Sequence, residues 1–75
     1  MELNEFVKAF ASEFDETPIE AFAPETKFKD LEEWSSLTAL SIISMVDEKM
    51  DKRVTGADIR NCENINDLFQ LVLTK

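Results

Sequence analysis

Two adjacent serines, Ser35 and Ser36, are the residues of this 75-residue chain best placed to do chemistry. They lie between Trp34 and Leu37, directly before an apolar stretch in which a helix is expected to begin. Serine is a favoured N-cap, because its side-chain oxygen accepts a hydrogen bond from a backbone N–H of the first turn. A cap uses only one of the two hydroxyls. If Ser35 is the cap, the hydroxyl of Ser36 stands at the positive end of the helix dipole, where an attached phosphate is favoured.

The composition excludes the usual nucleophilic enzymes. The chain has no histidine and a single cysteine, so neither a Ser–His nor a Cys–His pair can form within it. Cys62 also has no partner for an internal disulfide, and we expect it to be a small buried hydrophobe. The stretch "DLEE" lacks the order of acids and glycine that a calcium loop needs, so no metal site is predicted. We therefore expect a protein that is not itself an enzyme.

The charge points to protein partners. Sixteen acidic residues face eight basic ones, which gives a net charge of −8. Such a charge repels the phosphates of nucleic acids and anionic lipids, and it attracts partners that display basic patches. No segment approaches the roughly 20 apolar residues of a membrane span, and the first residues are too acidic for a signal peptide. We expect a monomeric cytoplasmic protein with no membrane insertion and no nucleic-acid partner.

Hydrophobic periodicity predicts a first helix whose apolar stripe consists of Leu3, Phe6, Phe10 and Phe14. Pro18 and Pro24 then stop helix propagation, so residues 15–35 are predicted to form a long loop. The apolar residues of this loop are expected to pin it to the core: Ile19, Phe22, Phe28 and Leu31.

A second helix is predicted to begin at the serine pair, with the stripe Leu37, Leu40, Ile43, Val46 and Met50, widened by Ala39, Ile42 and Met45. Leu37 and Leu40 are expected to be partly exposed near the serines. Thr55 and Asp58 predict the start of a short third helix, and Asn64 and Asp67 the start of a fourth. The predicted fold is all-α: one domain over residues 1–75, a small bundle of three longer helices and one short, with the long loop between the first two. The residues expected to converge in its core are Phe6, Phe10, Phe28, Ile43, Val46, Ile59, Leu68 and Val72.

The segment "FKDLEEWSSLTALSIISMVDEKM", residues 28–50, resembles the central segment of acyl carrier proteins. In that family an Asp-Ser-Leu triplet opens a helix after an acidic stretch, and the helix closes on an acidic pair and a large apolar residue. Here Ser36 and Leu37 match the triplet's last two residues. Asp47 and Glu48 match the acidic pair at the end of the family's helix, and Met50 matches the large apolar residue that follows it. The flanking elements follow in the family's order, so the resemblance covers nearly the whole chain.

The resemblance implies that Ser36 carries 4′-phosphopantetheine through a phosphodiester. The thiol of this arm would hold acyl groups as thioesters for fatty acid, polyketide-like or specialised lipid biosynthesis, and a small apolar interior would admit the acyl chain. The implied partners are a phosphopantetheinyl transferase and acyl-transferring or synthase enzymes with basic patches. The residues expected to dock these partners are Leu37, Leu40, Asp47, Glu48, Asp30, Glu32 and Glu33.

The chain departs from the family pattern at Ser35, where the family has aspartate, and at Thr38 and Ser41, where acids are common. A serine still caps the helix, but a negative charge beside the modified hydroxyl is lost. Two alternatives stay open. One is a discrete aminoacyl or peptidyl carrier, although the glycine pair that usually precedes the serine of peptidyl carriers is absent. The other is a helical interaction module without a prosthetic group, which the serine at position 35 favours.

Overall fold

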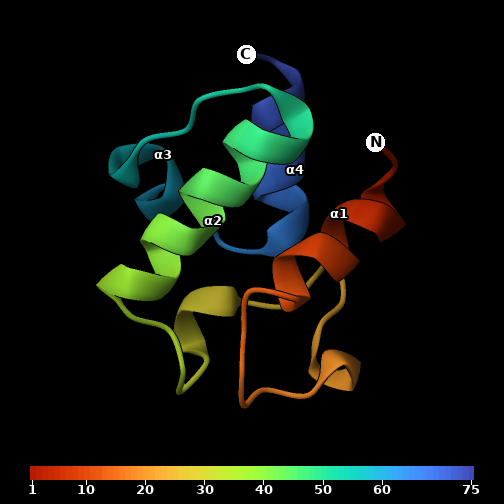
Figure 1. Ribbon diagram of the computed structural model, residues 1–75, viewed down its shortest axis with the longest axis vertical. Helices are drawn as coiled ribbons and strands as arrows, with labels where there is room; N and C mark the ends of the chain where they lie inside the picture. Colours follow the sequence, from red (N-terminus) through yellow and green to blue (C-terminus); the bar gives the residue numbers. More distant parts are fainter.

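The computed structural model describes residues 1–75, and all of its regular elements are helical (Figure 1). The α-helices are α1 (Leu3–Ala11), α2 (Ser36–Met50), α3 (Gly56–Arg60) and α4 (Ile65–Leu73). Two 3₁₀ turns, η1 (Ile19–Ala21) and η2 (Phe28–Asp30), lie in the long connection between α1 and α2, in the lower part of the view. The prediction of an all-α chain with four helices, one of them short, is confirmed.

The helices pack into a body of 29 × 24 × 20 Å. Helix α1 contacts both α4 and α2, while α2 also contacts α3 (Figure 1). None of the helices combines the length and the apolarity needed to cross a bilayer. The arrangement leaves the start of α2 at the edge of the molecule, between the end of the long connection and α3.

Side-chain caps fix where the two last helices begin. The Thr55 hydroxyl accepts a hydrogen bond from the Asp58 N–H at 3.1 Å, and the Asp58 carboxylate accepts one from the Thr55 N–H at 2.9 Å, which confirms the predicted capping box. At α4, Asn64 Oδ1 accepts from the Asp67 N–H at 2.8 Å, as predicted. The Asp67 carboxylate, however, accepts from the N–H of Glu63 at 3.0 Å, so the return bond lies one residue earlier than expected.

The core is built from aromatic rings that reach from α4 to the start of α2. The ring centroids of Phe69 and Phe6 are 5.2 Å apart, those of Phe10 and Phe28 are 5.2 Å apart, and Phe28 meets Trp34 edge-on at 4.9 Å. Such tilted arrangements add to the free energy gained by burial. All six phenylalanines of the chain are buried: Phe6, Phe10, Phe14, Phe22, Phe28 and Phe69.

The apolar stripe predicted for α2 is covered only in its second half, and the expected exposure of Leu37 and Leu40 is confirmed. Leu37 and Leu40 are 76% and 60% exposed, whereas the buried residues of the helix are Ile42, Met45 and Val46. A step of three residues falls about 60° short of a helical turn, so three such steps carry the stripe about 180° around the helix. Leu37 and Val46 therefore lie on opposite faces. All of the predicted core residues are buried except Ile43, which is only partly covered.

The long connection is held by fewer apolar residues than expected. Phe22 and Phe28 are buried, and Leu31 packs against the core. The prediction for Ile19 is wrong, because its side chain is 58% exposed at the first position of η1. An apolar residue in a loop has no helical or strand period to direct it inward, so its type alone did not predict its burial.

The carboxylate of Glu33 joins the two ends of this connection, because it accepts hydrogen bonds from residues 15–17. Its Oε2 accepts a hydrogen bond from the Asp15 N–H at 2.7 Å, and its Oε1 accepts from the Glu16 N–H at 3.0 Å, the Thr17 N–H at 2.9 Å and the Thr17 hydroxyl at 2.8 Å. Partial desolvation raises the pKa of Glu33, but the hydrogen bonds from Asp15, Thr17 and Glu16 together lower it below its ordinary value of 4.5.

We expect Glu33→Gln to lower the melting temperature at neutral pH, because an amide cannot replace a charged acceptor of four hydrogen bonds. Since the folded-state pKa lies below the unfolded one, this stabilisation is complete above pH 4.5 and is lost as the pH falls through the folded value. The melting temperatures of the variant and the wild type should therefore converge in acid. Glu32→Gln is the matched control, because Glu32 is exposed. A Glu33→Gln deficit that persists unchanged in acid would contradict this role.

Candidate functional site

The two serines have different environments at the start of α2. Ser35 precedes the helix in an extended conformation, and its Oγ accepts a hydrogen bond from the Thr38 N–H at 3.3 Å. Its Oγ also lies 3.2 Å from Thr38 Oγ1, which donates its hydrogen to the Glu33 carbonyl at 2.9 Å, so Ser35 is the donor in this pair. Ser36 is the first helical residue, is exposed, and its hydroxyl has no hydrogen-bond partner. The predicted cap is confirmed, and Ser36 has the available hydroxyl.

The segment before the serines is fixed by Trp34. Its ring is half-buried, meets Phe28 edge-on and stacks near Phe14 at 6.4 Å. Trp34 thus seals the end of the long connection onto the core. The hydroxyl of Ser36 is exposed, but the backbone that carries it is held by the cap on one side and by this ring on the other.

The first turn of α2 contains no acidic residue. Thr38, which stands where the resembled family commonly has an acid, belongs to the capping network instead. No carboxylate side chain of this turn therefore offsets the positive end of the helix dipole beside Ser36.

A pocket of about 340 Å³ adjoins the two serines; we call it the serine pocket. It lies between η2, α2 and α3, and two of its lining residues are basic, Lys29 and Arg60. Its lining residues are Lys29, Trp34, Ser35, Ser36, Ala39, Gly56, Ile59 and Arg60.

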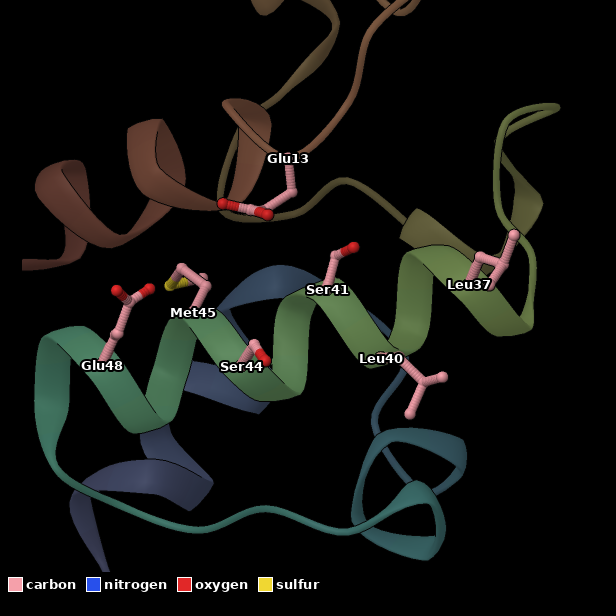
Figure 2. Close-up of a pocket in the computed structure, with 7 residues that line it drawn as sticks. All are labelled: Glu13, Leu37, Leu40, Ser41, Ser44, Met45 and Glu48. Atoms are coloured by element: carbon pink, nitrogen blue, oxygen red, sulfur yellow. The ribbon is translucent and has the colours of Figure 1, made fainter.

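A second concavity, the α2 groove, runs along a different face of the same helix (Figure 2). The exposed side chains of Leu37 and Leu40 lie toward its N-terminal end, and the carboxylates of Glu13 and Glu48 lie toward its C-terminal end. Its lining residues are Glu13, Leu37, Leu40, Ser41, Ser44, Met45 and Glu48. An apolar surface with two acids at one end is suited to a partner that offers an apolar contact beside basic side chains.

The structure brings only some of the predicted docking residues together. Leu37, Leu40 and Glu48 share the α2 groove, whereas Asp47 lines a separate recess with Arg53. The acids on the other side of the serines are Asp30 and Glu32, which are exposed, and Glu33, whose carboxylate is occupied by the protein's own loop.

Sequence reasoning missed several residues of both concavities. Ser41 and Ser44 follow Leu37 at spacings of four and three, so helical geometry could have placed them on one face with it. Glu13 and Arg60 come from segments far from α2 in the sequence, and no local pattern indicates that they approach it.

Cys62 behaves as predicted. Its side chain is 4% exposed, and desolvation raises the pKa of its thiol, with a further increase from the nearby Asp67 carboxylate. A buried thiol with a raised pKa is a poor nucleophile. No cluster of three or more metal-ligating side chains occurs in the chain.

Comparison with known proteins adds no assignment, since no family model, no curated protein and no solved structure matches the chain. A functional proposal therefore rests on the geometry at the start of α2 and on the resemblance of residues 28–50.

Proposed function

We propose that the chain is a carrier protein that bears 4′-phosphopantetheine on Ser36. The observation that carries the proposal is the unpaired, exposed hydroxyl of Ser36 at the first position of α2, beside a serine whose own hydroxyl is committed to the cap. The resemblance to acyl carrier proteins over residues 28–50 supplies the chemistry. In that family the modified serine is the one directly followed by leucine, which here is Ser36.

The residues at this site fit a phosphate diester. Ser36 is open to a modifying enzyme, no acid lies in the first turn of the helix, and Lys29 and Arg60 line the adjoining pocket. In the attachment step Ser36 Oγ attacks the phosphorus next to the pantetheine of coenzyme A. The diphosphate bond breaks, adenosine 3′,5′-bisphosphate leaves, and the hydroxyl proton passes to a base of the transferase. We assign the base to the transferase, because no side chain of the chain is hydrogen-bonded to the Ser36 hydroxyl.

When bound, the group supplies a thiol that holds a carboxylic acid as a thioester. We propose an acyl cargo for fatty acid, polyketide-like or specialised lipid synthesis. The interior supports this choice, because all of its buried residues are hydrophobic and none is polar or charged. Each methylene moved from water into such an interior contributes about 0.8 kcal/mol. A polar cargo would gain nothing comparable there.

Docking of partners should depend on Glu48 more than on Asp47. Glu48 lies in the α2 groove with Leu37 and Leu40, whereas Asp47 faces the recess that contains Arg53. We expect Glu48→Lys to lower kcat/KM for modification by a transferase with a basic patch by roughly tenfold at low salt, mainly through slower association. The same reversal at Asp47 is the matched control and should have the smaller effect.

Ionic strength provides the second check on this prediction. The difference between wild type and Glu48→Lys should shrink as salt rises, because exposed charges are screened. Equal kcat/KM values for the two proteins at low salt would contradict electrostatic docking in the α2 groove.

The experiment that tests the proposed function is the intact mass of the chain after incubation with coenzyme A and a phosphopantetheinyl transferase. A carrier gains one phosphopantetheine group. A helical interaction module without a prosthetic group keeps its mass.

A further inference from the structure

The serine pocket differs in charge from the other concavities along α2. Acids outnumber bases sixteen to eight in the chain, yet no acid lines this pocket and two of the eight bases do. The α2 groove contains Glu13 and Glu48, and the recess that Ile43, Ser44 and Val54 also line contains Asp47 beside Arg53. A cationic pocket on so acidic a protein is suited to a small anion.

The two bases reach the serine pocket from different segments, Lys29 from η2 and Arg60 from α3. Lys29 Nζ donates a hydrogen bond to the carbonyl oxygen of Arg60 at 2.7 Å, which holds the ammonium group at the last residue of the helix. The Arg60 side chain folds back along α3, since its Nη1 lies 3.5 Å from the position that a Cβ on Gly56 would take. Two side chains separated by 31 residues in the sequence thus converge on one pocket.

Neither base is neutralised by the protein. The one ion pair of the chain joins Lys75 to Asp58 at 2.9 Å, so Lys29 and Arg60 have no carboxylate partner. Lys29 has used one of its three donors on the Arg60 carbonyl, and the remaining ones are available. The Arg60 guanidinium has five donors in a planar fork that suits phosphate oxygens.

Apart from the two bases and the two serines, the lining of the serine pocket is apolar. Trp34, Ala39 and Ile59 line it, and Ile59 is nearly fully buried at 3% exposure. Ser36 lies among the lining residues, so a group attached to its hydroxyl starts at the pocket itself. Cations and an apolar surface in one concavity match a ligand that has a phosphate at one end and a less polar chain beyond it.

We propose that Lys29 and Arg60 hold the phosphate of the group attached to Ser36, and that the arm then lies across Trp34 and Ile59 in the serine pocket. This inference rests on the proposed function. The arm would thus rest on a different face of α2 from the α2 groove. A partner can therefore dock against Leu37 and Leu40 without meeting the arm.

The test compares unmodified and modified forms of the chain by two readouts that do not depend on catalysis. Trp34 is the only tryptophan, so its fluorescence emission reports on the serine pocket alone. Backbone amide chemical shifts then locate the arm. In the wild type we expect modification to change the emission of Trp34 and to shift the amides of Ala39, Ile59 and Arg60.

The double variant Lys29→Gln/Arg60→Gln removes both charges. Each lost charge is expected to shift the balance between pocket-bound and free arm by about threefold, so both readouts should shrink. Lys29→Arg/Arg60→Lys keeps the charges and should restore them. Lys27→Gln/Arg53→Gln is the matched control, because Lys27 and Arg53 are exposed bases that do not line the pocket.

Three outcomes would contradict the inference, and they differ in whether they also contradict the proposed carrier function. Wild-type chain that gains the arm but shows shifts only at residues 35–37, or along the α2 groove, contradicts the resting place and leaves the carrier function intact. A double variant that keeps the full response contradicts the role of the two cations. If the wild-type chain gains no mass in the modification reaction, that result contradicts both the proposed function and this inference.

Discussion

Replacing Ser36 by alanine is expected to abolish the attachment of phosphopantetheine, while Ser35→Ala leaves most of it. The reason lies in the two hydroxyls. Ser36 Oγ is exposed and unpaired, whereas Ser35 Oγ accepts from the Thr38 N–H and donates to Thr38 Oγ1. Intact mass after reaction with coenzyme A and a transferase measures the extent of modification, and peptide mapping locates it.

Ser35→Ala serves as the matched control for Ser36→Ala, because both remove one hydroxyl from adjacent residues. It should cost roughly 0.5–2 kcal/mol of stability through loss of the cap. Ser36→Ala should leave the melting temperature almost unchanged, since its hydroxyl makes no hydrogen bond. Phosphopantetheine mapped to Ser35 would contradict the assignment, even if the chain proved to be a carrier.

The largest effect on stability is expected from Phe28→Ala, at about 3–5 kcal/mol. The Phe28 ring is fully buried and lies 5.2 Å from Phe10 and 4.9 Å from Trp34, so its loss opens a cavity between the core and the segment that carries the serines. Small domains have only about 5–15 kcal/mol of total stability, so the variant would lose a large fraction of it. Urea denaturation followed by circular dichroism measures this loss.

Ile19→Ala is the matched control for Phe28→Ala, because both residues are apolar and belong to the same connection. Ile19 is 58% exposed, and its truncation should change stability by no more than about 0.5 kcal/mol. Similar losses in the two variants would contradict the view that Phe28 anchors the connection and the start of α2.

The helices were largely predictable because their signals are local. Thr55 and Asn64 cap helices in the structure as their spacing predicted, and Ser35 does the same at the candidate site. The buried face of α2 was not predictable from apolar residues alone, because Leu37 and Leu40 are as apolar as the core. Which apolar residues are covered depends on which elements pack against them.

The candidate site likewise has features that were predictable from local sequence and features that were not. The roles of Ser35 and Ser36 could be read from adjacent residues, since a cap is formed within one turn. The contact between Lys29 and Arg60, and the closure of residues 15–17 by Glu33, join segments 16 to 31 residues apart. Such contacts depend on tertiary packing, and no spacing in the sequence indicates them.

Intact-mass spectrometry of the wild-type chain, after incubation with coenzyme A and a phosphopantetheinyl transferase of broad specificity, tests the central claim most directly. A carrier protein of known modification in the same reaction shows that the enzyme is active. We predict conversion to a single species heavier by one phosphopantetheine group, because one serine at the start of α2 has an available hydroxyl. A chain that keeps its original mass while the reference protein is converted would contradict the claim.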